Sequence, residues 1–381
     1  MARHLNLASR PHDDEARMPQ PPKPLAILYD FLQVRGGAEA VTLFLRDAFP
    51  ESTVWVGAVD PAAFPSEMLE GVFSLSAHPP SANAALRAIL TAQRFKRASA
   101  RLNPYGSVLY SGHYAPLAVL RRAQGPNLLY AHAPPLPFAL DQHNEYLARC
   151  TWWQRAPFSA LCRWLRPRYE RAVRHMDTVI ANSEFVRASL SRHYGVNALV
   201  IHPPCRIDDL GWAGQDGYYL SFARLENYKR VDRIIEAFRR LPERRLVVGS
   251  EGSELLRLRA LAADAPNVEF AGALDRKRLR EILGGCIATI HIPRQEPFGI
   301  SVVESLAAGK PVIGVNEGGI PEIVVDGETG TLLCPDPSPG EIREAVISLP
   351  PSRAAGMRSA CQSRASRFGP EVFLRRIRKI L

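Results

Sequence analysis

Two glutamates, Glu296 and Glu304, lie eight residues apart around the start of an expected helix. A strand-like run ends at residue 292, and the turn 297–299 leads into a helical stretch over 299–308. Both carboxylates then face a ligand placed over the helix N-terminus, where unpaired N–H groups and the positive end of the dipole attract phosphate. Carboxylates also accept paired hydroxyls from a sugar or a ribose. The pattern therefore predicts a nucleotide-sugar site, lined by the carboxylates and by Phe298, Gly299 and Ile300.

Two cations follow another strand-like run, residues 218–223. Arg224 ends that run, and Lys229 precedes the helical stretch 231–240. Ligands of open parallel sheets bind at the carboxyl ends of strands, so this position favours contact with an anion. Lys229 together with its neighbour Arg230 would otherwise be read as a solvated charge run.

Two further candidates lie in the first half of the chain. Gly36 and Gly37 join the first expected strand, 25–30, to a helix over 38–48, and glycines let the backbone approach a ligand closely. His132 ends the strand-like run 127–131 and precedes a proline-rich loop. Plain turn chemistry and a structural histidine at a strand end are the alternatives for these two positions.

Short β-branched runs that alternate with helical stretches predict an α/β fold with parallel sheets. We expect a disordered leader (1–22), an N-terminal Rossmann-like domain (23–205), a hinge (206–217), a C-terminal Rossmann-like domain (218–365) and a final helix (366–381) that crosses back to the N-terminal domain. The other expected strands cover 53–58, 107–111, 178–182, 198–202, 218–223, 244–250, 267–272, 286–292, 311–315 and 330–334.

The string PRQEPFGISVVESLAAGKPVIGVNEGGIPEIVVDGETG (293–330) resembles the signature of glycosyltransferase family four, in which seven residues separate two glutamates. The resemblance implies a GT-B fold, with two Rossmann-like domains facing across a cleft, and a retaining transfer without an obligatory metal or cofactor. It assigns Glu296 to the donor-sugar hydroxyls, Glu304 to the nucleotide ribose, and Arg224 and Lys229 to the diphosphate. It also places Gly36 and Gly37 beside the donor phosphates, and His132 near the anomeric carbon.

The segments YAHAPPLPFALDQ (130–142) and YYLSFARLENYKRVD (218–232) resemble the family members that use GDP-mannose. We therefore expect GDP-mannose as the donor, with a UDP-sugar as the alternative. Asp141 is either an acceptor-side base or a helix cap. A glycan carried on a polyprenyl diphosphate is the expected acceptor, as part of polysaccharide or O-antigen synthesis.

Charge is unevenly spread along the 381 residues. The net charge is +10, and residues 86–192 carry 16 Lys plus Arg against 5 Asp plus Glu. The aromatic, arginine-rich stretch 151–175 is either a helix lying on an anionic membrane surface or a core-packed helix with a solvated basic face. No long apolar run and no nucleic-acid motif accompany it, so a cytoplasmic enzyme is expected, peripheral on the inner face of the membrane.

Two other classes of protein stay open at this point. One is an epimerase of the same fold that acts on UDP-N-acetylglucosamine, and it would lack the combined glutamate, arginine and lysine set. The other is a non-catalytic protein that binds nucleic acid or anionic lipid, an interpretation that only the net positive charge supports.

Overall fold

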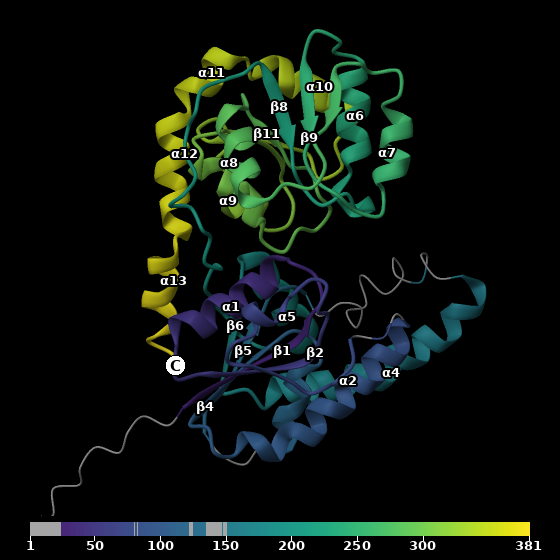
Figure 1. Cartoon of the computed structure of the whole chain (residues 1–381), viewed down its shortest axis with the longest axis vertical. Helices are drawn as coiled ribbons and strands as arrows, with labels where there is room; N and C mark the ends of the chain where they lie inside the picture. The colour runs from purple at the N-terminus through teal and green to yellow at the C-terminus, as the bar shows by residue number, and fades with distance from the viewer. Residues whose placement is uncertain (1–23, 80, 82, 122–124, 135–146, 148–150) are drawn as a thin grey trace, which may run out of the picture.

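The structure is a computed structural model that describes residues 24–79, 81, 83–121, 125–134, 147 and 151–381. The expected leader and Asp141 lie outside these residues. The described chain forms two α/β domains, stacked one above the other in Figure 1.

The N-terminal domain is built on a seven-stranded parallel sheet in the order β3-β2-β1-β4-β5-β6-β7. Its strands are β1 (Leu25–Leu32), β2 (Thr53–Val59), β3 (Val72–Ser74), β4 (Ser107–Ser111), β5 (Asn127–Ala131), β6 (Thr178–Ala181) and β7 (Leu199–Val200). Its helices are α1 (Gly37–Ala48), η1 (Ser66–Met68), α2 (Ala84–Ala98), η2 (Ser99–Leu102), η3 (Ala115–Arg121), α4 (Trp152–Arg174) and α5 (Glu184–Tyr194).

Both faces of this sheet are buried, which explains why its strands are apolar along their whole length rather than alternating. In β1, Ala26 and Leu28 join the core that contains residues of α2, α4 and α5. Ile27 and Tyr29 point the other way, into the core that contains residues of α1. Successive side chains of a strand point to opposite faces, so one strand contributes to both layers.

The C-terminal domain repeats this plan with a six-stranded parallel sheet in the order β10-β9-β8-β11-β12-β13. Its strands are β8 (Tyr218–Ser221), β9 (Arg245–Val248), β10 (Val268–Phe270), β11 (Thr289–Ile290), β12 (Val312–Val315) and β13 (Gly330–Leu333). Its helices are η4 (Asn227–Lys229), α6 (Val231–Arg239), α7 (Leu255–Leu261), α8 (Arg276–Gly285), α9 (Ile300–Ala307), η5 (Ile320–Glu322), α10 (Pro339–Ser348), α11 (Pro351–Gly356) and α12 (Arg358–Ala365). Helix α6 buries Val231, Ile234, Ile235 and Phe238, the spacing that puts one apolar stripe on the sheet.

The chain passes between the domains twice. On the first passage Ile201 belongs to the N-terminal core, whereas Cys205 and Leu210 belong to the C-terminal core. The segment 206–217 therefore lies on the C-terminal domain, and the crossing itself falls between residues 201 and 205.

The second passage runs through α12, η6 (Ser366–Phe368) and α13 (Pro370–Ile377), along one side of the molecule (Figure 1). Phe373 and Ile377 of α13 are buried in the N-terminal core, where the Phe373 ring meets those of Phe44 and Tyr130. The C-terminal helix thus completes the N-terminal domain.

Candidate functional site

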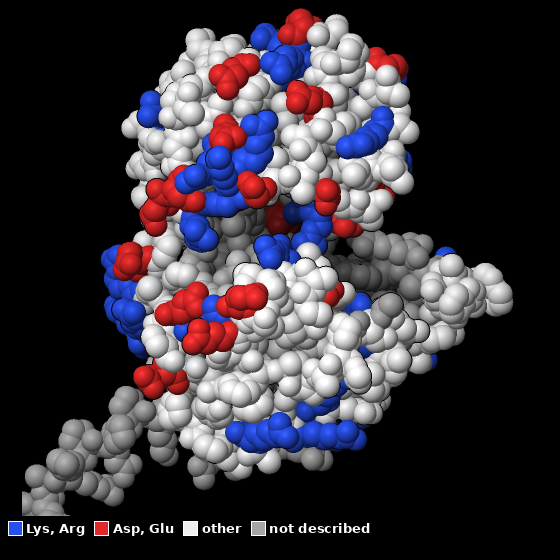
Figure 2. Space-filling model, viewed as in Figure 1, with Lys and Arg blue, Asp and Glu red and all other residues white. Residues whose placement is uncertain are grey.

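Both sheets have a topological switch point that faces the other domain. In each sheet the chain first moves outward in one direction and then returns to the other side of its first strand, so the crevice lies between β1 and β4 and between β8 and β11. The loops that follow these strands meet across the domain boundary. Figure 2 shows a cleft between the two domains, with basic and acidic side chains along its edges.

Lys229 and Glu296 form an ion pair at the C-terminal switch point. Lys229 Nζ lies 2.5 Å from Glu296 Oε2, and the two side chains are only 12% and 17% exposed. Burial works to lower the pKa of Lys229, but Glu296 and Tyr228 raise it above its ordinary value. The lysine therefore stays charged and neutralises a carboxylate that would otherwise be buried without a partner.

Arg230, next in the chain, has a different role. Its buried guanidinium donates to the carbonyls of Ile292 and Pro293 and to the carboxylate of Asp336. It thereby fixes the start of the loop that carries Glu296 against η4, the turn that carries Lys229.

Arg224 is exposed and lies close enough to Lys229 to lower the pKa of that lysine. The glycine turn of the N-terminal domain comes up to it: a Cβ on Gly36 would lie 3.8 Å from the Arg224 guanidinium and 2.8 Å from Glu39 Oε2. A Cβ on Gly37 would lie 2.7 Å from Cδ1 of Ile300. The two glycines therefore permit a close approach between domains at the site of the cations.

Helix α9 begins at this same point. Gly299 precedes it with φ of 109°, in the left-handed region that favours glycine. The Phe298 ring turns inward, 3% exposed, and stacks on His202 with 5.4 Å between ring centroids. Gly299 and Ile300 thus border the cleft, whereas the side chain of Phe298 belongs to the core.

Glu304 lies on the second turn of α9 and is held by a residue that the sequence did not single out. Arg276, the first residue of α8, places Nη1 2.6 Å from Glu304 Oε1 and Nη2 2.5 Å from Asp209 Oδ1. Burial raises the pKa of Glu304, and Arg276 opposes that rise. Both signature glutamates are therefore paired with a cation in the absence of ligand.

His132 lies on the N-terminal side, at the end of β5. Its Nε2 is 2.6 Å from Ser111 Oγ, and its ring packs edge-on against Tyr130 and Tyr29. Burial, and then His113, lower the pKa of His132 to about 3, so the imidazole is neutral at physiological pH. A neutral imidazole has one hydrogen-bond donor and one acceptor, and it brings no charge to the cleft.

The carboxyl group of Asp30 anchors the N-terminal switch point. It accepts the backbone N–H groups of His113, Tyr114 and Ala115 at 2.5, 2.9 and 2.8 Å, while burial raises its pKa to about 6. A Cβ on Gly112 would lie 2.5 Å from the Asp30 carboxylate. The sequence carried a signal for this contact, because the expected strand 25–30 ends in Asp30 and the expected strand 107–111 is followed by Gly112.

Glu322 joins the two domains. From η5 of the C-terminal domain, its Oε2 accepts the backbone N–H of Glu184 at 2.8 Å and its Oε1 accepts that of Phe185 at 3.0 Å. His202 Nε2 lies 3.1 Å from the same carboxylate. The side chain of Ser183 accepts the next free N–H of α5, that of Val186. The unpaired N–H groups at the start of α5 therefore find acceptors in both domains.

Within the described part of the chain, no three His, Cys, Asp or Glu side chains gather as metal ligands. None of its helices is long and apolar enough to cross a bilayer.

Comparison with known proteins finds a glycosyltransferase family match for each domain. Residues 35–208 match the family described as Glycosyltransferase Family 4, and residues 206–367 match the family described as Glycosyl transferases group 1. The two matches together run without a gap from residue 35 to residue 367, so they include both glycines of the turn, His132, Arg224, Lys229, Glu296 and Glu304, whereas β1 with Asp30 precedes them.

Individual relatives are distant. The mouse protein named alpha-1,3/1,6-mannosyltransferase ALG2 is 27% identical over 295 residues, which are 68% of each chain. An uncharacterized glycosyltransferase of Methanocaldococcus jannaschii is 25% identical over 183 residues, 48% of this chain and 52% of its own length. The crystal structure of Anabaena HepE with UDP and glucose superposes with a TM-score of 0.71 at 19% identity, over 94% of this chain and 99% of that one.

Proposed function

We propose that this chain, a glycosyltransferase with the GT-B fold, transfers mannose from GDP-mannose to a lipid-linked glycan, with retention of the anomeric configuration and without a required metal. The observation that carries the proposal is the Lys229–Glu296 ion pair, with Arg224 beside it and the start of α9 next to it. The likeness to a mannosyltransferase supports the choice of sugar.

The ion pairs suit a site that exchanges partners when donor enters. A diphosphate replaces Glu296 as the partner of Lys229, and sugar hydroxyls then become the partners of Glu296. Glu304 is placed to accept the ribose hydroxyls while Arg276 continues to hold its Oε1. Lys229 and the two glutamates thus have a partner both with and without donor, which avoids the cost of an isolated buried carboxylate.

The transfer itself moves negative charge onto the leaving diphosphate. The acceptor oxygen forms its bond to the anomeric carbon on the face from which the diphosphate leaves, and the acceptor proton passes to a phosphate oxygen. Because charge on the diphosphate grows as the glycosidic bond breaks, Arg224 and Lys229 bind the transition state more tightly than the ground state. In this scheme His132 positions the donor sugar as a neutral hydrogen-bonding group.

A turnover assay tests the proposal. Purified protein is incubated with GDP-mannose or UDP-glucose and a polyprenyl-diphosphate-linked sugar as acceptor, with EDTA or with added magnesium, and the glycosylated product is followed by NMR of its anomeric proton. We expect GDP-mannose to be consumed equally with EDTA and magnesium, and the product to keep the α configuration of the donor. Consumption of UDP-glucose alone would overturn the choice of donor, and inversion at the anomeric carbon would overturn the stereochemistry.

A further inference from the structure

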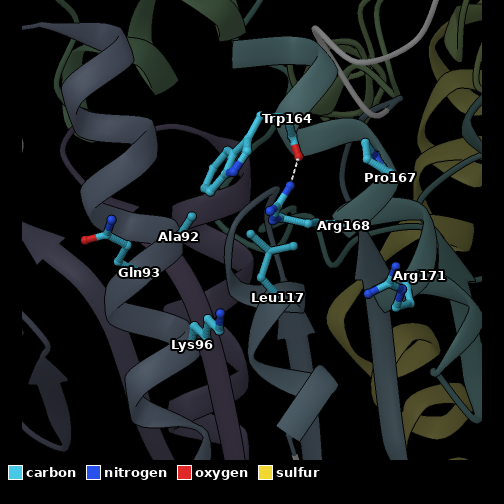
Figure 3. A pocket seen from close by; sticks show the side chains of 8 residues that line it. All are labelled: Ala92, Gln93, Lys96, Leu117, Trp164, Pro167, Arg168 and Arg171. Atoms are coloured by element: carbon cyan, nitrogen blue, oxygen red, sulfur yellow. Dashed lines mark hydrogen bonds between the residues drawn. The ribbon is translucent and has the colours of Figure 1, made fainter. Parts of the chain in front are cut away.

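The N-terminal domain has a second cavity that the donor site does not use. It lies between α2 and α4, with a volume of about 500 Å³, and is lined by Ala92, Gln93, Lys96, Leu117, Trp164, Pro167, Arg168 and Arg171. Figure 3 shows Leu117 between the two helices, at the base of the groove.

Cations that form no ion pair with the described residues border one end of this groove. Helix α2 carries Arg87, Arg94, Lys96 and Arg97 and no acid, and α4 carries six arginines against one acid, Glu170. Glu170 lies 3.8 Å from Arg166, which does not line the groove. None of the ion pairs among the described residues includes Lys96, Arg168 or Arg171.

Arg168 is already oriented. Its Nη1 donates to the backbone carbonyl of Trp164 at 2.5 Å, and its guanidinium lies 4.4 Å from the centre of the Trp164 ring. A guanidinium has five N–H donors, so donors remain for a phosphate above the indole.

Apolar side chains are exposed along the other end of the groove. The two helices run past the groove in the same direction. In Figure 3 the step from Ala92 to Lys96 along α2 points the same way as the step from Trp164 to Arg171 along α4. Towards their N-termini, α2 exposes Leu86 (48%) and Ile89 (36%), in line with Gln93 and Lys96 at helical spacing. Helix α4 exposes Trp152 (84%) and Trp153 (59%) on first turns that project beyond the rest of the domain in Figure 1.

We propose that the α2–α4 groove binds an anionic phospholipid of a membrane surface, with the phosphate held by Lys96, Arg168 and Arg171 and the apolar part towards Leu86, Ile89 and Trp153. The charge of the groove complements a phosphate, and indole rings are the side chains that settle at the level of lipid headgroups. The half-buried face of Trp164 and the buried Leu117 provide an apolar floor between these two ends. This inference concerns a surface apart from the donor site and does not depend on the identity of the donor.

Vesicle flotation tests the proposal on the full chain. We expect the protein to float with vesicles of phosphatidylcholine and phosphatidylglycerol, and not with phosphatidylcholine alone. Each cation near an anionic surface strengthens binding about five-fold, so the double variant Lys96→Gln/Arg171→Gln should bind about 25-fold more weakly. The matched control, Arg375→Gln/Arg376→Gln, removes two exposed arginines from α13 and should bind as the native chain does.

The apolar end has its own variants. Trp153→Ser should weaken binding to the mixed vesicles, whereas Leu256→Ser, a change of a still more exposed apolar residue on α7, should not. Equal losses in both members of either pair would overturn the site. Displacement by soluble glycerol phosphate, or equal binding of a short oligonucleotide, would show a general anion surface and overturn the lipid assignment.

Nucleotide binding by the same variants separates this inference from the proposed function. Loss of vesicle binding with unchanged nucleotide binding supports the groove as a site of its own. Vesicle binding that is unaltered in Lys96→Gln/Arg171→Gln overturns the inference and leaves the transferase proposal intact.

Discussion

Replacing Lys229 with methionine removes the cation of the buried pair while keeping most of the side-chain volume. In the native chain two opposite charges are 2.5 Å apart, at 12% and 17% exposure. At an effective dielectric constant near 20, unit charges about 4 Å apart already attract by about 4 kcal/mol. Removal of one partner from a fully buried pair costs about 3–5 kcal/mol, and because both groups retain some solvent we expect about 2–3 kcal/mol here.

A double-mutant cycle measures this interaction. The free energy of unfolding of the C-terminal domain is determined by urea titration for Lys229→Met, Glu296→Gln and the double variant. We expect the double variant to be more stable than the sum of the single losses predicts, by about 1–3 kcal/mol. Lys277→Met, the same change at an exposed lysine of α8, is the control and should leave stability within about 0.5 kcal/mol of the native chain.

The same variants report on turnover. If Lys229 stabilises the leaving diphosphate, Lys229→Met should lower kcat/KM about 100-fold or more, the loss typical of an electrostatic group aimed at a developing charge. Lys277→Met should keep native turnover. Coupling near zero in the cycle would refute the energetics of the ion pair, and native turnover in Lys229→Met would refute its place in the donor site.

Three further predictions concern other contacts. Burial lowers the pKa of His113 to about 4 and that of His132 and His291 to about 3. Below pH 6.5 these histidines are protonated in the unfolded chain but stay neutral in the folded one. The free energy of unfolding should therefore fall by about 2 kcal/mol per histidine between pH 7 and pH 5. Asp30 has a folded pKa of about 6, so it binds a proton in the folded chain at a higher pH than in the unfolded chain, and it offsets only about 1.4 kcal/mol of this loss of stability at pH 5. A urea titration showing equal stability at pH 7 and pH 5 would contradict the burial of the histidines. Glu322→Gln replaces one acceptor oxygen of the inter-domain contact with a donor, and should cost about 1–2 kcal/mol in thermal unfolding; an unchanged melting temperature would mean that the contact does not hold the domains together. Arg276→Met leaves Glu304 without its cation, so GDP binding measured by calorimetry should weaken about tenfold, the effect of losing one charge-assisted contact, and native affinity would show that Arg276 does not position this carboxylate.

The architecture could be predicted from the sequence because burial dictates it. Every strand expected from an apolar run is present, with β4 and β5 at the expected bounds. Strands β7 and β11 are shorter than the runs 198–202 and 286–292, although Ile201, Ile287 and His291 beside them still donate backbone hydrogen bonds to neighbouring strands. The edge strand β3 was missed because it has three residues and exposes Phe73, so its sequence carries little sign of burial.

The candidate site could be predicted only in part. Spacing along one helix placed Glu296 and Glu304 around the start of α9, and the expected ends of strands placed Arg224 and Lys229 near them. The contacts of Arg276 and Glu322 join elements far apart in the chain, and no periodicity encodes which elements meet there. The inward turn of Phe298 was missed for a similar reason, since its partner His202 lies in the crossing between domains.

Calorimetric titration of GDP, and of UDP as the alternative nucleotide, into the native chain and into Glu304→Ala, each with and without EDTA, tests the central claim most directly. We expect GDP to bind the native chain saturably, with an affinity that EDTA does not change. Binding to Glu304→Ala should be at least tenfold weaker, because the ribose hydroxyls lose a charged acceptor. Failure of the native chain to bind either GDP or UDP, or equal affinity in the two proteins, would contradict a nucleotide-sugar site at α9.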